Sequence, residues 1–390
     1  MTAAEPHVPT QRDATAVLAR FAVPGSMLSL EPHTSGLINH SWVATFATPA
    51  DRRRYVLQQI NRHVFHHPDE VMENMVRVTS HVAARLAREG APDAGRRVLS
   101  FVPTHEGVSH HVDAAGETWR LVPWVEGTRA TERASTEAEA RETARAFGRF
   151  LAHLHDLPAP PLHETILAFH DTPGRLVAFE RAIAADRAAR ASECRREIEA
   201  LLDRRALASA LAEPAARDEI PVRPTHNDAK IANVLFDATT GEGLCVVDLD
   251  TVMPGLAPYD FGDLARSTVS DSDEDERDLT RVFVRVPVFE ALARGFVEGA
   301  GEALSPAERA LLVAGAEVIV YEQAIRFLGD HLDGDRYYRT LRPGHNLDRA
   351  RTQIRLLESL EAAGPELRRS FSHLGGAVPH PPDPPLATVE

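Results

Sequence analysis

The sequence predicts an α+β fold of two lobes, a small antiparallel-sheet lobe followed by a larger, mainly helical lobe. Residues 28–126 contain short strand-like runs around a single helical segment. After residue 127 the composition becomes alanine-rich, and the apolar residues recur at helical spacing. One strand-and-loop segment, 221–263, interrupts these helices and holds the candidate reactive residues. A chain of 390 residues is long enough for two such lobes.

The small lobe is expected to be a sheet with one helix. Large and small side chains alternate in the first strands, and an arginine-rich turn separates two of them. Apolar residues three and four positions apart predict a helix over 68–88. Strands are expected at 41–46, 54–60, 98–103 and 119–125, and the last two are joined by a hairpin connection at 105–116.

The second lobe is expected to consist of long helices. Thr136 lies three residues before Glu139, which is the spacing of a helix N-terminal cap. The helical segments are expected at 135–157, 172–211, 279–299, 306–332 and 347–363. We place the small lobe at 14–126 and the helical lobe at 127–372, with a mobile N-terminus (1–13) and a disordered proline-rich tail (373–390).

Composition excludes several classes of partner. The net charge of −14 would repel a nucleic acid, and no basic patch offsets it. The two cysteines, Cys194 and Cys245, have no metal-ligand spacing and indicate no disulfide framework. Residues 1–13 lack the features of a signal peptide, and no apolar stretch is long enough to span a bilayer. We therefore expect a cytoplasmic monomer or homodimer that acts on a small molecule.

The densest group of candidate catalytic residues lies in the segment 226–233. Transfer of a phosphoryl group to a hydroxyl needs a carboxylate that orients the hydroxyl and accepts its proton, and Asp228 is the candidate. Asn233, five residues later, can bind Mg²⁺, and Lys230 can neutralise charge on the γ-phosphate. His226 would brace the loop by hydrogen bonds. This spacing is typical of a kinase catalytic loop, and the order of elements around it is typical of the bilobal protein-kinase-like fold.

A second group of carboxylates follows the next apolar run, 244–248. Asp248 ends this run and would bind Mg²⁺ between the phosphates of a bound nucleotide. Asp250 is expected to face the same way, because side chains alternate along a strand, and is a further candidate metal ligand. Asp260-Phe261-Gly262 spells the metal-binding tripeptide of protein kinases, but it follows a loop rather than a strand. We expect Asp260 and Asp263 to cap and brace the helical lobe near the loop instead.

These segments resemble the N-acetylhexosamine 1-kinases, a group within the aminoglycoside phosphotransferase-like superfamily of choline and sugar kinases. The resemblance implies a kinase that uses ATP and Mg²⁺ and phosphorylates the anomeric hydroxyl of GlcNAc or GalNAc. It places the catalytic base on Asp228 and the metal ligands on Asn233 and Asp248. The similar segments are 226–234, 247–255 and 259–263, with further matches at 55–60, 325–330 and 346–354.

The same resemblance suggests where the substrates bind. Sugar contacts would fall on Asp228, Arg326 and Tyr337, and Asn39 in the turn before the second strand is a further candidate. From the residues alone, Arg326 is as readily explained by a structural ion pair with an acid such as Asp330 or Asp263, since it lies in an apolar helical stretch.

Two positions depart from the family pattern. Leu37 stands where known members have a histidine, which weakens the case for the same sugar. The lysine that kinases carry on the third strand is absent, and Gln58 or Gln59 takes its place. A neutral amide can donate a hydrogen bond to phosphate but adds no charge, so Lys230 and Mg²⁺ would supply more of the neutralisation.

The adenine site is expected at the connection between the lobes, residues 121–126, where backbone groups would bind the edge of the base. Pro123 has no N–H, so the donor should be Trp124 or Val125. Two other functions stay open: a kinase for another hexose, an amino alcohol or an aminoglycoside, and a kinase-like module without catalytic activity. The acidic run 271–276 would suit a cationic substrate. A module without activity should lack Asp228, Asn233 or Asp248, and all three are present.

Overall fold

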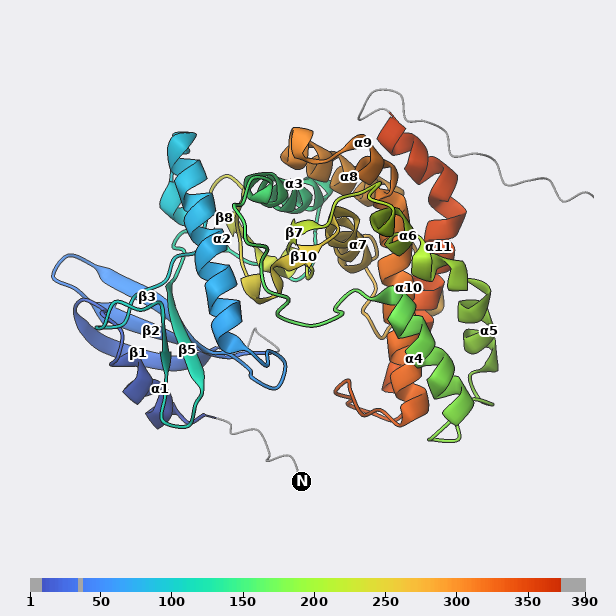
Figure 1. Cartoon of the computed structure of the whole chain (residues 1–390), viewed down its shortest axis with the longest axis horizontal. Helices are drawn as coiled ribbons and strands as arrows, with labels where there is room; N and C mark the ends of the chain where they lie inside the picture. The colour runs from blue at the N-terminus through green and yellow to red at the C-terminus, as the bar shows by residue number, and fades with distance from the viewer. Residues whose placement is uncertain (1–8, 34–37, 373–390) are drawn as a thin grey trace, which may run out of the picture.

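A computed structural model describes residues 9–33 and 38–372 of the chain. It has the two lobes that the sequence predicts, an antiparallel sheet and a larger helical lobe (Figure 1). The long helix α2 (Pro68–Arg88) begins and ends where its apolar spacing predicted, and it lies between the sheet and the helical lobe. Residues 1–8 of the predicted mobile segment 1–13 and the whole predicted tail 373–390 lie outside the described residues.

The small lobe is a five-stranded antiparallel sheet in the order β1-β2-β3-β5-β4. A short helix, α1 (Gln11–Leu18), packs on one face of it, and Thr10 and Asp13 form a capping box at its start. This helix was not anticipated, and it begins inside the segment 1–13 that was expected to be mobile. The strands are β1 (Ser26–His33), β2 (His40–Ala47), β3 (Arg52–Gln59), β4 (His110–Val112) and β5 (Thr118–Pro123).

One predicted strand, 98–103, is wrong. This segment is an extended connection, and the edge strand is β4, from the part of the chain expected to be a hairpin loop. Val98 packs into the core of the helical lobe, whereas Val102 packs into the core of the small lobe. Its apolar residues therefore join two cores rather than line one face of a sheet, a difference that hydrophobicity alone does not reveal.

The two faces of the small sheet differ in character. Trp42, Leu57 and Trp119 lie on the face that forms a buried core with α1. On the opposite face the register aligns side chains of neighbouring strands in rows, because directly paired residues point to the same side. One row is Val43, Val56 and Val122, and the next is Ser41, Gln58 and Arg120.

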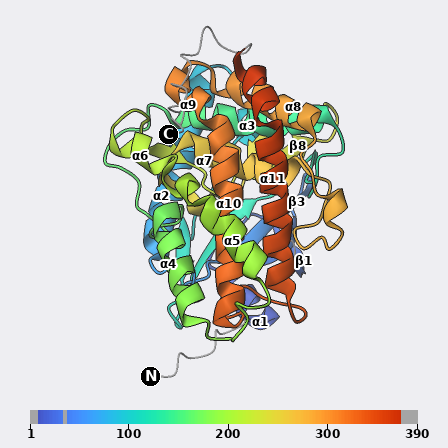
Figure 2. The same ribbon diagram turned by 90° about the vertical axis from the view of Figure 1, so that its right-hand side faces the viewer.

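The helical lobe holds two small antiparallel sheets, β10-β7 and β6-β8-β9, among its helices. Figure 2 shows α4, α5, α10 and α11 as a layer that faces the viewer, on the side of this lobe away from the small sheet. The strands are β6 (Thr128–Arg129), β7 (Arg223–Thr225), β8 (Val234–Asp237), β9 (Gly243–Val246) and β10 (Met253–Gly255). The helices are α3 (Glu137–Leu154), α4 (Thr172–Ala185), α5 (Arg195–Asp203), α6 (Ala212–Ala216), α7 (Ala257–Thr268), α8 (Val286–Ala300), α9 (Pro306–Ala310), α10 (Leu312–Asp333) and α11 (His345–Ser372).

Helix α3 supports the segment that carries the candidate catalytic residues. Its start follows the predicted cap, since the Thr136 side chain accepts from the Glu139 N–H. Gly148 lets α3 approach α8 closely, because a Cβ there would lie 2.4 Å from the carbonyl oxygen of Phe296. Among the helices of the described ranges, none combines the length and hydropathy that a bilayer crossing requires.

Candidate active site

Two polar side chains of the loop between β7 and β8, the candidate catalytic loop (residues 226–233), converge on Asp228. The Lys230 Nζ donates to Asp228 Oδ2 at 2.8 Å, and the Asn233 Nδ2 donates to the Asp228 backbone oxygen at 2.9 Å. Burial opposes the charge of Lys230, but the Asp228 carboxylate outweighs it and raises the lysine's pKa. Among the described residues, Asp228 Oδ1 has no hydrogen-bond partner and is free to accept from a hydroxyl.

The backbone of this loop is held in an unusual conformation at Asn227. Asn227 has a φ of 63°, in the left-handed region that a residue other than glycine seldom occupies. Its side-chain amide donates to the backbone oxygens of Thr225, Thr251 and Met253, at 3.0 to 3.2 Å. These bonds compensate for the strained backbone and fix the direction in which Asp228 leaves the loop.

Asp260 provides the second support of the loop. Its two carboxylate oxygens accept from the backbone N–H groups of His226 and Asn227, at 2.9 and 2.7 Å. The residue is 2% exposed, and burial raises its pKa to about 7. Asp260 was expected to brace the helical lobe near the loop, and its contacts show that it holds the loop backbone itself. Asp260 lies on α7, which begins at Ala257. The strand-and-loop segment therefore ends before Ala257 and not at residue 263 as predicted.

His226 is fully buried beneath the loop. Its Nε2 lies 3.0 Å from the Val247 backbone oxygen, and its Nδ1 lies 3.3 Å from the Asp228 N–H. One nitrogen must donate and the other accept, so the imidazole is neutral, and burial lowers its pKa. The ring packs edge-to-face on Phe147 of α3, with centroids 5.1 Å apart. His226 thus supports the loop and does not reach the cleft.

Asp248 follows β9 and points toward the same region as Asp228. It is solvent-exposed on one side, and it makes no hydrogen bond or ion pair with any residue that the structure describes. Partial burial and the nearby carboxylates of Asp250 and Asp228 raise its pKa to about 6. A carboxylate that carries this cost without a cationic partner suits a bound metal ion.

Asp250 occupies a different environment from the one predicted. Asp248 has a φ of 61°, so the chain turns there and enters a 3-10 segment, and the alternation expected of a strand is lost. Both Asp250 carboxylate oxygens accept from the Arg120 guanidinium, and one also accepts from the Asn39 amide at 2.7 Å. Its side chain is 3% exposed. These contacts correct the assignment of Asp250 as a metal ligand: it is the buried partner of Arg120.

The row Val43–Val56–Val122 forms an apolar patch on the face of the sheet turned toward the helical lobe. None of the three valines belongs to a hydrophobic core cluster of the described residues. The row lies next to Pro123, where the chain leaves the sheet for the helical lobe. A flat apolar surface in this position can cover a planar ring, and its position was not visible without the strand register.

The predicted nucleotide-binding residues lie beside this patch. The Trp124 N–H donates to the Arg54 backbone oxygen at 2.9 Å, and the Trp124 ring stacks under the Arg54 guanidinium. Trp124 therefore completes the sheet, and Val125 has the N–H that finds no partner among the described residues. Pro123 is half-buried, and Gln58 lies on the same side of the sheet as the valine row.

Arg326 and Tyr337, the predicted sugar contacts, lie together near the end of α10. The Arg326 guanidinium lies 6.0 Å from the Tyr337 ring and donates to the Gln323 side chain at 2.7 Å. Its nearest carboxylate is Glu322, at 3.9 Å, not Asp330 or Asp263. Tyr337 is 73% exposed and so does not pack into the core. Leu37 lies outside the described residues, and Asn39 bonds to Asp250 and to the Asn61 N–H.

His170, which the sequence did not single out, links α10 to the catalytic loop. Its Nδ1 lies 3.2 Å from Glu322 Oε1, and its Nε2 lies 2.9 Å from the Asn227 backbone oxygen. Both neighbours are acceptors, so both ring nitrogens carry a proton and the ring is a cation. Burial opposes this charge, but Glu322 and Asp263 outweigh it and raise the pKa of His170 to about 9.

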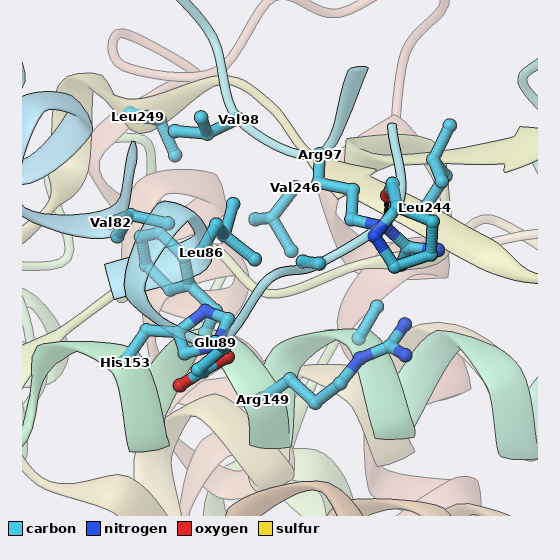
Figure 3. Close-up of a pocket in the computed structure, with 14 residues that line it drawn as sticks. Val82, Leu86, Glu89, Arg97, Val98, Arg149, His153, Leu244, Val246 and Leu249 are labelled. Atoms are coloured by element: carbon cyan, nitrogen blue, oxygen red, sulfur yellow. Dashed lines mark hydrogen bonds and ion pairs between the residues drawn. The ribbon is translucent and has the colours of Figure 1, made fainter. Parts of the chain in front are cut away.

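Two cavities differ in their relation to the catalytic loop. One, of about 290 Å³, lies between α2 and α3, and Figure 3 shows Val82 and Leu86 facing Arg149 and His153 across it. Its lining contains no catalytic-loop residue, and its arginines already pair with Glu242. The other, of about 320 Å³, opens beside Lys230 and has polar walls.

Comparison with known proteins identifies the family and the fold. The model of the phosphotransferase enzyme family matches residues 29–308, well over half of the chain. Similar solved structures show the same fold at low sequence identity. An aminoglycoside phosphotransferase from Alicyclobacillus acidocaldarius is 14% identical with a TM-score of 0.55, covering 95% of this chain and 98% of that one.

Two further solved structures are similar over nearly their whole length. A spectinomycin phosphotransferase, solved with ADP and spectinomycin, is 12% identical with a TM-score of 0.56, covering 91% of this chain and 99% of that one. A choline/ethanolamine kinase family protein from Mesorhizobium loti is 18% identical with a TM-score of 0.50, covering 93% and 98%.

The charge on His170 predicts a pH dependence of stability. Its pKa is about 9 in the folded chain, against an ordinary value of 6.5, so its stabilising effect is full below pH 6.5 and is lost as pH rises through 9. Between these values we expect the free energy of unfolding to fall by about 1–3 kcal/mol in the wild type, and by clearly less in His170→Gln. Urea denaturation at several pH values measures this. The exposed His155→Gln variant should keep the wild-type slope, and an equal slope in His170→Gln would contradict the prediction.

Proposed function

Because the chain belongs to the phosphotransferase enzyme family, we propose that it is an ATP-dependent kinase for the anomeric (C1) hydroxyl of an N-acetylhexosamine such as GlcNAc or GalNAc. The transfer of a phosphoryl group to a small hydroxyl substrate is the activity of the family; the sugar is the finer part of the proposal. One observation carries it: the free oxygen of Asp228, held beside Lys230 and Asn233 and below the open face of the small sheet.

The two rows of side chains on the sheet indicate which end of the nucleotide would lie near the connection between the lobes. The valine row lies near Val125, and the N–H of Val125 is available to the edge of the adenine. The rings of the base would then stack beneath the valine row. The polar row, with Gln58, lies further from the connection between the lobes and so covers the phosphates. This orientation brings the γ-phosphate toward Asp228 and Lys230.

Within this arrangement Asp228 acts as the base. Its Oδ1 accepts the hydrogen bond of the acceptor hydroxyl, orients the oxygen toward the γ-phosphorus and takes the proton as the new bond forms. Lys230, bound to Oδ2, keeps Asp228 ionised and places positive charge beside the transferred group. Asn233 fixes the Asp228 backbone, and His226 and Asp260 hold the loop from below.

The residues present fit a divalent cation. The Asn233 amide nitrogen is bound to Asp228, which leaves its oxygen for a ligand, and Asp248 has no cationic partner among the described residues. No cluster of three or more His, Cys, Asp or Glu in the described ranges could hold a metal by itself. Mg²⁺ characteristically takes one or two protein oxygens together with phosphate and water, so Asn233 and Asp248 would suffice. When bound, Mg²⁺ neutralises charge on the phosphates.

The acidic run 271–276 argues against a cationic acceptor. Each of its carboxylates already has a basic partner within the lobe, so the run adds little negative potential to the cleft. The pairs are Asp271–Arg285, Asp273–Arg133, Glu274–Arg266, Asp275–Arg342 and Glu276–Arg281. This neutralisation favours an uncharged sugar over an amino alcohol or an aminoglycoside.

Arg326 and Tyr337 supply groups that a sugar can use. A chain of contacts leads from Arg326 through Glu322 and His170 to Asn227, so the pair lies on the catalytic side of the helical lobe. An exposed tyrosine ring can pack on the apolar face of a hexose, and a guanidinium can donate to its hydroxyl or acetamido oxygens.

The assignment of Asp248 and Asp260 is tested by their amide variants. Asp260→Asn should lower the free energy of unfolding by about 1–3 kcal/mol, because an N–H group would face another donor in a buried site. Asp248→Asn should not lower it, because Asp248 lies among like charges, but should abolish the Mg²⁺ dependence of ATP binding. Denaturation and calorimetry with and without Mg²⁺ measure both. If Asp260→Asn loses the Mg²⁺ dependence and Asp248→Asn keeps it, the two roles are reversed.

Removal of the base tests the mechanism. Asp228→Asn should reduce kcat by about 10²–10⁴-fold, the usual contribution of a general base. ATP affinity should change little, because Asp228 is neither a proposed adenine contact nor a proposed metal ligand. Single-turnover phosphoryl transfer and ATP titration measure the two quantities, and substantial turnover in Asp228→Asn would show that another group is the base.

A panel of acceptors tests the substrate. ADP release should rise with GlcNAc or GalNAc, and the product should resist reduction at C1 because the anomeric position is phosphorylated. Glucose, galactose, choline, ethanolamine and an aminoglycoside form the comparison set. Turnover with one of these and none with the N-acetylated sugars would replace the proposed acceptor while leaving the kinase activity in place.

A further inference from the structure

The polar row of the small sheet contains a buried cation. Ser41, Gln58 and Arg120 are direct partners across β2, β3 and β5, so their side chains lie side by side. Gln58 stands at the place where protein kinases carry a phosphate-binding lysine on the third strand. Arg120, one strand away, is the cation nearest to that place in the row.

The contacts of Arg120 assign its hydrogen-bond donors. The side chain is 2% exposed, and both terminal nitrogens donate to the Asp250 carboxylate in a bidentate pair. The remaining nitrogen, Nε, donates to Gln58 Oε1 at 3.0 Å. With its guanidinium buried in this way, Arg120 does not itself reach a ligand in the cleft, and its influence on one passes through Gln58.

Arg120 determines which end of the Gln58 amide faces which neighbour. A guanidinium can only donate, so the atom beside Nε must be the amide oxygen. The amide nitrogen is therefore turned away from Arg120 and lies 3.2 Å from the Ser41 hydroxyl. One N–H of that nitrogen is left for a further acceptor. Without Arg120 the amide could rotate and present its oxygen, which would repel a phosphate.

We propose that Arg120 is a positioning residue that orients Gln58 as a hydrogen-bond donor to the triphosphate of the nucleotide. The inference rests on the proposed function in so far as the cleft binds ATP. In this chain two residues take the role of the lysine on the third strand. Gln58 on β3 is the neutral donor, and Arg120 on β5 is the buried cation that fixes the donor's direction.

The pair with Asp250 gives this arrangement its rigidity. Arg120 belongs to the small lobe and Asp250 to the helical lobe, two residues beyond Asp248. A bidentate buried pair has a single favourable geometry. It therefore holds the phosphate-facing row of the sheet at a set distance from Asp248, and Asn39 adds a third contact from the start of β2.

Binding of MgATP and of adenosine, each measured by calorimetry, tests the proposal without an acceptor. Loss of Arg120 alone would leave Asp250 buried and unpaired, so the pair is removed together as Arg120→Met/Asp250→Leu. We expect MgATP affinity to fall by about ten-fold, the value of one hydrogen bond to a charged group, with adenosine affinity unchanged. Adding Gln58→Lys should restore MgATP affinity, because a lysine needs no orienting partner. Asp51→Asn/Arg53→Gln, an exposed pair at the start of β3, is the control and should bind like the wild type.

Three outcomes would overturn the proposal: unchanged MgATP affinity in the double variant, an equal loss for adenosine, or no recovery with Gln58→Lys. If the double variant does not fold, Gln58→Leu with the ion pair intact gives the same test: a selective loss of MgATP affinity supports the role of Gln58, and wild-type affinity contradicts it. A wild-type protein that binds neither ligand would instead contradict the proposed function.

Discussion

The catalytic loop depends on one buried carboxylate. Asp260 accepts the N–H groups of His226 and Asn227, and these two bonds hold a backbone that turns through a left-handed residue. Both N–H groups are buried, so no water could replace the carboxylate. Without Asp260, each N–H group would be buried without a hydrogen-bond acceptor, which would destabilise the loop. Helix α7 carries Asp260 and packs against α10, so the position of Asp228 is set by the core of the helical lobe rather than by the loop itself.

Three cations in and around the cleft each pair with a carboxylate. Arg120 pairs with Asp250, Lys230 with Asp228, and His170 with Glu322. Asp248 makes no ion pair with a described residue, and burial together with the carboxylates of Asp250 and Asp228 raises its pKa to about 6. An external cation beside such a carboxylate would lower the free energy, and for this reason we propose Asp248, rather than Asp250 or Asp260, as the metal ligand.

The net charge of −14 has a different meaning once the structure is known. The acidic run at 271–276 looked like an exposed negative patch that could attract a cationic substrate. Its carboxylates are instead paired with arginines, some from the flanking residues (Arg266, Arg281, Arg285) and some from distant segments (Arg133, Arg342). The density of acidic residues in a sequence segment therefore says little about the potential in a cleft, because it does not show which carboxylates are paired in the folded chain.

The sequence by itself determined what depends on local spacing. The helix α2, the cap at Thr136 and the loop from His226 to Asn233 all involve residues within a few positions of one another, and the kinase-like chemistry follows from that loop. Only the tertiary structure decided which carboxylate has which role. Asp248, Asp250 and Asp260 are alike in sequence, but Asp250 meets Arg120, 130 positions away, and Asp260 meets the backbone of the loop. The role of a carboxylate depends on the charges and donors around it, and those neighbours are set by packing rather than by spacing along the chain.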